Sequence, residues 1–488
     1  MRILLAQNLI HLPSHGGANK SNRLLMERLA ARGHEVHVVS PLSGALATGP
    51  SPVPGTGPTP VTASGPSPVT ASGPSPVSGA GASSGTGPSS GTGPSSGTGA
   101  SSGTGASSGI GASSGAGASS ALDELTRRGA TLVTSDDPDE VTYLHRGVVV
   151  HAVTDPAALP RRIAEVAARL VPDWTLVPSD DPGLVVLGAA LRATPGRVVY
   201  LVHTLQQLPF GPGAFYPSAA GTRMVRRAAG VVAVSRAARD YCLRHAGLHS
   251  TVIYPHIYGD TAPPAAAPTA PYVTMINPCA YKGLPILLGL ADACPAVTFQ
   301  AVPTWGATAD ERAALARRPN IRLTPPADDL GPILDDARAL LMPSLWDETF
   351  GYTCVEAMLR GVPVLAADVG GLAEAKRGVP YLLPVAPIER YEAAPGHARP
   401  VPVVPAQDLT PWLAALRRLM DDPAHHATLA GRSADAARAF VRGLDPDALE
   451  TYLTALSPAT GKERQDPHRR AALARLAAAR AAAKGAAR

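Results

Sequence analysis

Two glutamates, Glu348 and Glu356, lie on either side of Gly351, where an apolar strand pattern changes to a helical one. Glu348 is therefore expected in the loop and Glu356 in the first turns of the helix. Carboxylates suit sugar hydroxyls because each accepts hydrogen bonds from two neighbouring donors. The free N–H groups of Gly351, Tyr352 and Thr353 are expected to face an anion, as at other helix N-termini. The pattern suits a ligand with hydroxyl and anionic groups, but the spacing alone is weak evidence, because a surface carboxylate and a glutamate near a helix N-terminus are each common.

Two other loops contain residue types that suit phosphate groups. Lys282 precedes Gly283 after the predicted strand 272–276, although a lysine there can also be an ordinary helix-start residue. Gly16 and Gly17 follow the predicted strand 3–6, and a backbone without Cβ atoms can approach an anion closely. Because two adjacent glycines alone more often form a turn, their interpretation depends on the rest of the chain.

The segment 342–358, followed by 361–364 and 368–374, resembles family 4 retaining glycosyltransferases and their E-x7-E signature. The resemblance implies that Glu348 contacts the transferred sugar and that Glu356 contacts the ribose of the nucleotide. It also places four neighbouring residues at the donor: Phe350, Gly351, Tyr352 and Thr353.

The loop 276–283 resembles the donor-phosphate loop of the same family, which has an arginine and a lysine five positions apart. Lys282 matches the lysine, but Asn277 stands at the arginine position. The departure removes one cation from the place where the leaving diphosphate gathers charge. Either the helix N-termini and Lys282 suffice, or a basic residue elsewhere substitutes.

The first half of the chain resembles the family more loosely. The resemblance places Gly16 and Gly17 under the diphosphate and next to the acceptor, with Asn19 and Lys20 as candidates for acceptor contacts. It also implies that His203, at the end of a predicted strand, hydrogen-bonds the donor sugar. The alternative is a histidine whose hydrogen bonds are satisfied at a strand end.

Strand and helix patterns alternate along both halves of the chain, which predicts parallel sheets with right-handed crossovers. The expected fold class is α/β of the GT-B kind, with two doubly wound Rossmann-like domains facing a central cleft. The predicted domains are an N-terminal acceptor-binding domain (1–42 and 121–260) and a C-terminal nucleotide-sugar-binding domain (271–456).

Three segments are expected outside these domains. Residues 43–120 repeat Gly, Ser, Pro, Thr and Ala without charge, and such a composition predicts a disordered insertion. Residues 261–270 are rich in proline and alanine and are predicted to form an interdomain linker. Residues 457–488 form an Ala/Arg-rich tail.

Composition restricts the class of protein. The net charge of +5 is small for 488 residues and is scattered, which favours anionic small molecules over nucleic acid as partners. Four widely separated cysteines predict reduced, mostly buried thiols in a cytoplasmic protein. No apolar run approaches the length of a transmembrane segment, and no HxH or DxD pattern stands at a plausible strand end, so neither metal nor cofactor is expected.

Together these features predict a retaining, metal-independent glycosyltransferase, resembling a hexosyltransferase, with Glu348, Lys282 and His203 in catalytic positions. The expected donor is a nucleoside diphosphate sugar, UDP-linked rather than GDP-linked on family frequency. The acceptor is a small molecule, lipid or glycan that the sequence does not identify. The alternative is a catalytically inactive GT-B module that binds nucleotide sugars or serves as a partner subunit, which Asn277 supports.

Overall fold

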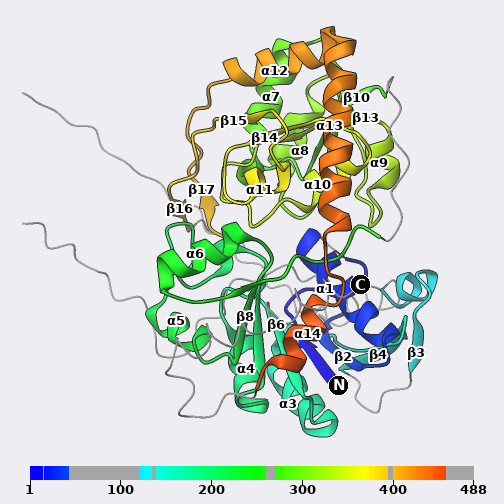
Figure 1. Cartoon of the computed structure of the whole chain (residues 1–488), viewed down its shortest axis with the longest axis vertical. Coiled ribbons are helices and arrows are strands. Elements are labelled where there is room, and N and C mark those ends of the chain that lie inside the picture. The colour runs from blue at the N-terminus through cyan, green and yellow to red at the C-terminus, as the bar shows by residue number, and fades with distance from the viewer. Residues whose placement is uncertain (15, 43–120, 134–138, 260–269, 394–398, 458–488) are drawn as a thin grey trace, which may run out of the picture. The chain divides into compact units, whose positions relative to one another are not determined.

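The computed structural model describes residues 1–14, 16–42, 121–133, 139–259, 270–393 and 399–457 (Figure 1). The predicted insertion lies outside these residues, as do the predicted linker apart from Ala270 and the predicted tail apart from Ser457. The domain boundaries therefore remain a prediction. The four cysteines are free and buried, which agrees with the prediction of reduced, mostly buried thiols. No helix in the described ranges is long and apolar enough to cross a membrane.

The first sheet has nine described strands in the order β3-β4-β5-β2-β1-β6-β7-β8-β9. Pairing is parallel from β5 to β9 and antiparallel at the β3–β4–β5 edge. The strands are β1 (Arg2–Ala6), β2 (Glu35–Pro41), β3 (Thr131–Val133), β4 (Glu140–His145), β5 (Val148–Val153), β6 (Trp174–Pro178), β7 (Val198–Val202), β8 (Gly230–Ala233) and β9 (Thr251–Val252).

Helices cover both faces of the first sheet because its central strands are apolar on both sides. On β1, Leu4 and Ala6 pack with α3 and α4, whereas Ile3 and Leu5 face a second cluster that includes α1. The helices of this half are α1 (Gly17–Ala31), residues 121–127, α3 (Leu159–Leu170), α4 (Val185–Ala193), α5 (Ala219–Val225) and α6 (Arg236–Ala246), with short 3-10 turns η1 (Pro156–Ala158) and η2 (Leu205–Gln207).

The second sheet is parallel throughout, in the order β12-β11-β10-β13-β14-β15. Its strands are β10 (Tyr272–Ile276), β11 (Phe299–Val302), β12 (Ile321–Leu323), β13 (Ala337–Met342), β14 (Val364–Ala367) and β15 (Leu382–Leu383), and β16 (Tyr391–Glu392) pairs with β17 (Val401–Pro402) as a separate hairpin. Its helical elements are η3 (Ala280–Lys282), α7 (Leu284–Ala293), α8 (Ala309–Ala316), α9 (Gly331–Asp335), α10 (Tyr352–Leu359), α11 (Leu372–Lys376), α12 (Thr410–Asp421) and α13 (Pro423–Arg442).

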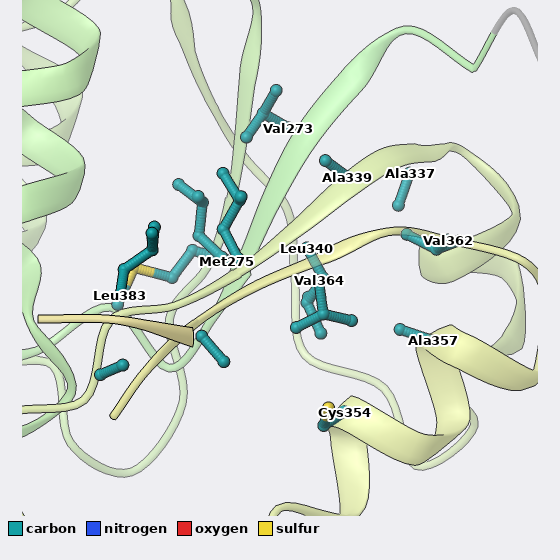
Figure 2. Close-up of a cluster of buried hydrophobic side chains, with 14 of the residues drawn as sticks. Val273, Met275, Ala337, Ala339, Leu340, Cys354, Ala357, Val362, Val364 and Leu383 are labelled. Carbon is teal, nitrogen blue, oxygen red and sulfur yellow. The ribbon is translucent and has the colours of Figure 1, made fainter. Parts of the chain in front are cut away.

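The core of the second half fixes α10 against the sheet. Figure 2 shows Cys354 and Ala357 of α10 facing the strands that carry Leu340 and Val364. All four side chains are fully buried. This packing positions the start of α10 at the carboxyl edge of the sheet, where Gly351 precedes the helix.

Both sheets contain a point where the chain order of the strands reverses. In the first sheet β1 lies between β2 and β6, and in the second β10 lies between β11 and β13. Ligands of doubly wound folds bind outside the carboxyl ends of the strands at such a point. The Gly16–Gly17 loop follows β1, the Lys282 loop follows β10, and the Glu348 loop follows β13. The topology thus brings the three predicted loops to the places where a ligand is expected.

The last described helix, α14 (Ala448–Ala455), packs against the first sheet although it follows α13 of the second half (Figure 1). Its Leu449, Tyr452 and Leu453 are buried in the cluster that contains Ile3 and Leu5 of β1. Arg32 at the end of α1 also forms an ion pair with Glu450. The residue pattern alone did not predict this return of the chain to the first half.

Candidate active site

Glu348 lies in the loop after β13 and is held by side chains of its own half. Its Oε1 accepts hydrogen bonds from Lys282 Nζ at 2.5 Å, from Trp346 Nε1 at 3.3 Å and from the Ser344 hydroxyl. The side chains of Lys282 and Glu348 are 19% and 13% exposed, respectively. Burial alone would raise the pKa of Glu348, but Lys282, Ser344 and Trp346 outweigh it and hold the pKa below its usual value. The structure therefore brings the predicted pair Glu348 and Lys282 together with the carboxylate charged.

Trp346 adds to the setting of this pair. The Lys282 ammonium lies 4.6 Å from the centre of the Trp346 ring, within the range of a cation–π contact. The ring packs in turn against Tyr281 and Trp305. Sequence reasoning did not single out Trp346 or Ser344, although Trp346 is one of only four tryptophans in the chain and lies two residues before Glu348.

Glu356 lies on α10, and its partner comes from the first half of the chain. Lys20 Nζ is 2.7 Å from Glu356 Oε1, and the two side chains are 21% and 11% exposed, respectively. Both residues line a cavity of about 190 Å³ together with residues of the 257–259 and 329–331 segments and with Arg360. The cavity thus lies between the halves, as the predicted cleft requires, and Lys20 contacts Glu356, the predicted ribose ligand.

Asn277 has a structural role in the loop after β10. Its backbone is in the left-handed region, at φ 58°, and its Oδ1 accepts a hydrogen bond from the Gly306 N–H at 3.0 Å. A Cβ at Gly306 would lie 2.8 Å from the same oxygen and 2.6 Å from Cys279 Sγ. Asn277 therefore fixes the loop after β11 against the loop after β10.

Gly16 and Gly17 lie against the second half of the chain. A Cβ at Gly17 would lie 2.5 Å from Tyr352 Cδ2, and one at Gly16 would lie 3.5 Å from the Trp305 indole nitrogen. Gly16 also has φ +90°, which disfavours a side chain. The start of α1 therefore approaches the start of α10 at a distance that requires glycine.

The start of α10 offers free backbone N–H groups to a ligand, whereas the side chain of Phe350 beside it belongs to the core. Gly351 has φ +122°, and the N–H groups of Tyr352 and Thr353 belong to the first turn, where no helical carbonyl is available to them. Phe350 is buried and packs on Tyr254, Tyr352 and Phe440. Any donor contact of Phe350 would therefore have to come from its backbone.

His203 lies at the end of β7 on the first sheet. Its N–H donates to Ser179 Oγ at 2.9 Å, and its ring Nδ1 has no hydrogen-bond partner within the described part of the chain. Burial lowers its pKa to about 4, so the ring is neutral near pH 7. It lines an apolar pocket with Ser21 of α1 and Tyr254. The structure does not bring His203 into hydrogen-bond contact with Glu348 or Lys282.

Acidic residues also lie at the reversal point of the first sheet. Asp180 follows β6 and accepts hydrogen bonds from the Asn8 N–H at 3.2 and 3.3 Å. Burial, and then the neighbouring Asp181, raise its pKa well above the usual value. Among the described residues, no group of three or more His, Cys, Asp or Glu side chains is arranged to hold a metal ion.

Residues 275–394 match the family model described as "Glycosyl transferases group 1". Over 150 residues the chain is 31% identical to D-inositol 3-phosphate glycosyltransferase of Kineococcus radiotolerans, and the alignment covers 30% of this chain. The chain spans about a third (32%) of the length of that relative.

Three solved structures resemble the whole fold. HepE of Anabaena, in complex with UDP and glucose, is 16% identical with a TM-score of 0.53, covering 93% of this chain and 100% of HepE. TarM of S. aureus, in a complex that contains UDP, is 10% identical with a TM-score of 0.54 and coverage of 93% and 99%. WaaG, a glycosyltransferase of lipopolysaccharide biosynthesis, is 11% identical with a TM-score of 0.50 and coverage of 94% and 100%. The chain therefore has the GT-B fold, and its residues 275–394 are similar to the glycosyl transferases group 1 family.

Proposed function

We propose that the chain transfers a sugar from a nucleoside diphosphate sugar to an acceptor with retention of the anomeric configuration. The observation that carries this proposal is the charged pair Lys282–Glu348 at the carboxyl ends of β10 and β13. The pair lies within the residues that match the glycosyltransferase family model. A lysine and a carboxylate at the strand-order reversal suit a ligand with a diphosphate and a hydroxylated sugar.

In this proposal Glu348 binds hydroxyls of the transferred sugar, and Glu356 binds the ribose. Lys282 and the first-turn N–H groups of α10 stabilise the diphosphate as it leaves. The bond from the anomeric carbon to the acceptor oxygen forms on the face from which the diphosphate departs, and the acceptor proton passes to a departing phosphate oxygen. Catalysis then rests on electrostatic stabilisation of the leaving group and on positioning of the acceptor.

UDP is the proposed nucleotide. HepE and TarM, which share the fold, were solved in complexes that contain UDP. We further propose that the reaction needs no metal, because Lys282 and the N-termini of α1 and α10 supply positive charge at the place where the leaving diphosphate is proposed to lie.

A panel of UDP- and GDP-sugars tests the proposal, with nucleotide release followed in a coupled assay, with and without EDTA and with a mixture of simple glycosides as acceptors. Release from one donor class, with product of the donor's own anomeric configuration by NMR, is the expected result. Saturable binding without release or transfer would instead support the inactive binding module. Product of the opposite configuration would contradict the retaining mechanism.

A further inference from the structure

The diphosphate site lacks a cation at Asn277, so another basic side chain has to be considered. Asn277 is engaged with Gly306 and is only 6% exposed, so it has little freedom to turn towards a ligand. Lys282 supplies a single positive charge, whereas a diphosphate linked to a nucleoside and a sugar carries about two negative charges. One more cation near the starts of α1 and α10 would balance the site.

Lys20 is placed to be that cation. Its backbone N–H donates to the Gly16 carbonyl at 3.0 Å, so it belongs to the first turn of α1. Side chains on a helix lean towards its N-terminus, which directs the Lys20 stem towards the Gly16–Gly17 loop. That loop touches Tyr352 at the start of α10. The ammonium thus belongs to a side chain of the first turn of α1 and is bonded to Glu356, the fifth residue of α10 and the proposed ribose ligand.

We propose that Lys20 is the second cation of the diphosphate site and that it exchanges partners when the donor binds. Ribose hydroxyls would take over the Glu356 carboxylate, and the released ammonium would move to the diphosphate on its flexible four-carbon stem. The ion pair Lys20–Glu356 then neutralises two partly buried charges until the donor replaces it. This inference rests on the proposed function, since it assigns Lys20 to the same donor.

Arg360 is the other basic residue that lines the cavity. Its Nε donates to Asp335 Oδ1 at 3.0 Å, and its Nη1 donates to the Glu356 carbonyl at 3.4 Å. It lies one turn further along α10 from Glu356, at the end of the helix away from Tyr352. Arg360 therefore makes a matched control, because it shares the cavity with Lys20 but lies at the other end of the helix from the proposed phosphate site.

Binding of UDP, UMP and uridine, measured by calorimetry, separates a phosphate-binding role from a structural one. Lys20→Met should weaken UDP binding by on the order of 10- to 100-fold, the scale of one charge-assisted hydrogen bond. The affinity for UMP should fall by a smaller factor. The affinity for uridine should fall little or rise, because Glu356 is freed for the ribose. Arg360→Gln should change the affinities for the three ligands by the same factor. An equal loss for all three ligands in Lys20→Met would show that Lys20 only positions Glu356 and would overturn the inference.

Lys20→Met leaves the Glu356 carboxylate without its lysine, which could impair folding. A Glu356→Gln background controls for this effect. In a Glu356→Gln protein that charge is absent, and Lys20→Met should still weaken UDP binding by a similar factor. Asn277→Arg should then restore part of the lost UDP affinity. No loss of UDP affinity on Lys20→Met in the Glu356→Gln background would overturn the inference.

The unsubstituted protein distinguishes failure of this inference from failure of the proposed function. If it binds neither UDP nor GDP, the donor site itself is wrong. If it binds UDP and Lys20→Met binds UDP equally well, Lys20 alone has been misassigned.

Discussion

Both halves of the molecule bury ionisable side chains in the loops that follow their parallel strands, and three such groups of the first half differ in charge state from Glu348 of the second. In the first half, burial lowers the pKa of His203 to about 4 and that of His11 to about 3, and raises the pKa of Asp180. Each of these groups is therefore favoured in its neutral form. In the second half, Glu348 has its pKa lowered despite burial and stays charged.

The difference follows from the partners of each group. Glu348 accepts from an ammonium and two further side-chain donors, whereas both ring nitrogens of His11 lack hydrogen-bond partners among the residues the structure describes. Burial opposes charge unless an opposite charge lies within hydrogen-bonding distance. We therefore expect the second half to supply charged side chains to a ligand, and the first half to supply the backbone of Gly16 and Gly17 together with the cation Lys20.

The largest expected effect tests Lys282, the cation of the charged pair in the second half. Lys282→Ala should lower kcat/KM by on the order of 100-fold or more, because its contact with the diphosphate strengthens as charge develops on the leaving group. Lys282→Arg should recover part of the rate, since a planar guanidinium fits an ammonium site imperfectly. Steady-state kinetics with the active sugar nucleotide measure both, with Arg438→Ala on the surface of α13 as control. Parental rates in Lys282→Ala would refute the placement of the donor-phosphate loop.

The next effect separates the two carboxylates. Glu356→Gln should weaken binding of UDP by about 1–3 kcal/mol, the scale of a hydrogen bond to a charged group. Glu348→Gln should instead lower kcat for the sugar nucleotide and leave the affinity for UDP almost unchanged, because UDP has no transferred sugar. Calorimetry with UDP compares them. Equal affinities for UDP in the Glu356→Gln and parental proteins would remove the ribose assignment.

A smaller effect tests the backbone contribution of the first half. Gly17→Ala would place a Cβ against Tyr352, so the start of α1 should move away and UDP affinity should fall by roughly 10-fold, within the range of overpacking effects. Gly431→Ala on α13 meets no atom within 4 Å and should stabilise the protein by about 0.5–1 kcal/mol. An unchanged UDP affinity in Gly17→Ala would mean that the two helix starts need not be so close.

The smallest expected effect tests whether buried His11 of the first half is neutral. Folding lowers the pKa of His11 from 6.5 to about 3, so its contribution to stability is complete above pH 6.5 and is lost as the pH falls towards 3. His11→Gln should therefore lose less stability than the parent between pH 7 and pH 5, by roughly 2–4 °C in Tm. Exposed His249→Gln is the control. Equal losses in the parent and in His11→Gln would show that folding does not lower the pKa of His11.

Much of the fold was predictable because apolar runs between turns mark buried strands. The predicted bounds of β10 agree with the structure, and the prediction of parallel sheets is confirmed except at the antiparallel β3–β4–β5 edge of the first sheet. The β4–β5 hairpin was missed because its strands mix polar and apolar residues. The signal was nevertheless present in Arg146-Gly147, which both adopt positive φ as a two-residue hairpin turn requires.

The candidate site was predictable where topology decides the outcome. Glu348 and Lys282 follow adjacent strands, and parallel strands end at the same edge of the sheet. The contact of Lys20 with Glu356 was not predictable, because it joins two residues 336 positions apart and depends on how the two halves approach each other. The roles of these residues remain predictions that the experiments above address.

The return of α14 to the first sheet has a consequence for the order in which the chain can mature on the ribosome. Tyr452 fills the space beside Gly230 that a Cβ would otherwise occupy, and Leu449 and Leu453 cover the same side of the sheet. These side chains emerge only after the entire second sheet has been synthesised. Domains generally fold from the N-terminus during translation, but here the first sheet stays partly uncovered until α14 has been synthesised. A nascent chain that stops after α13 would expose that apolar surface to chaperones.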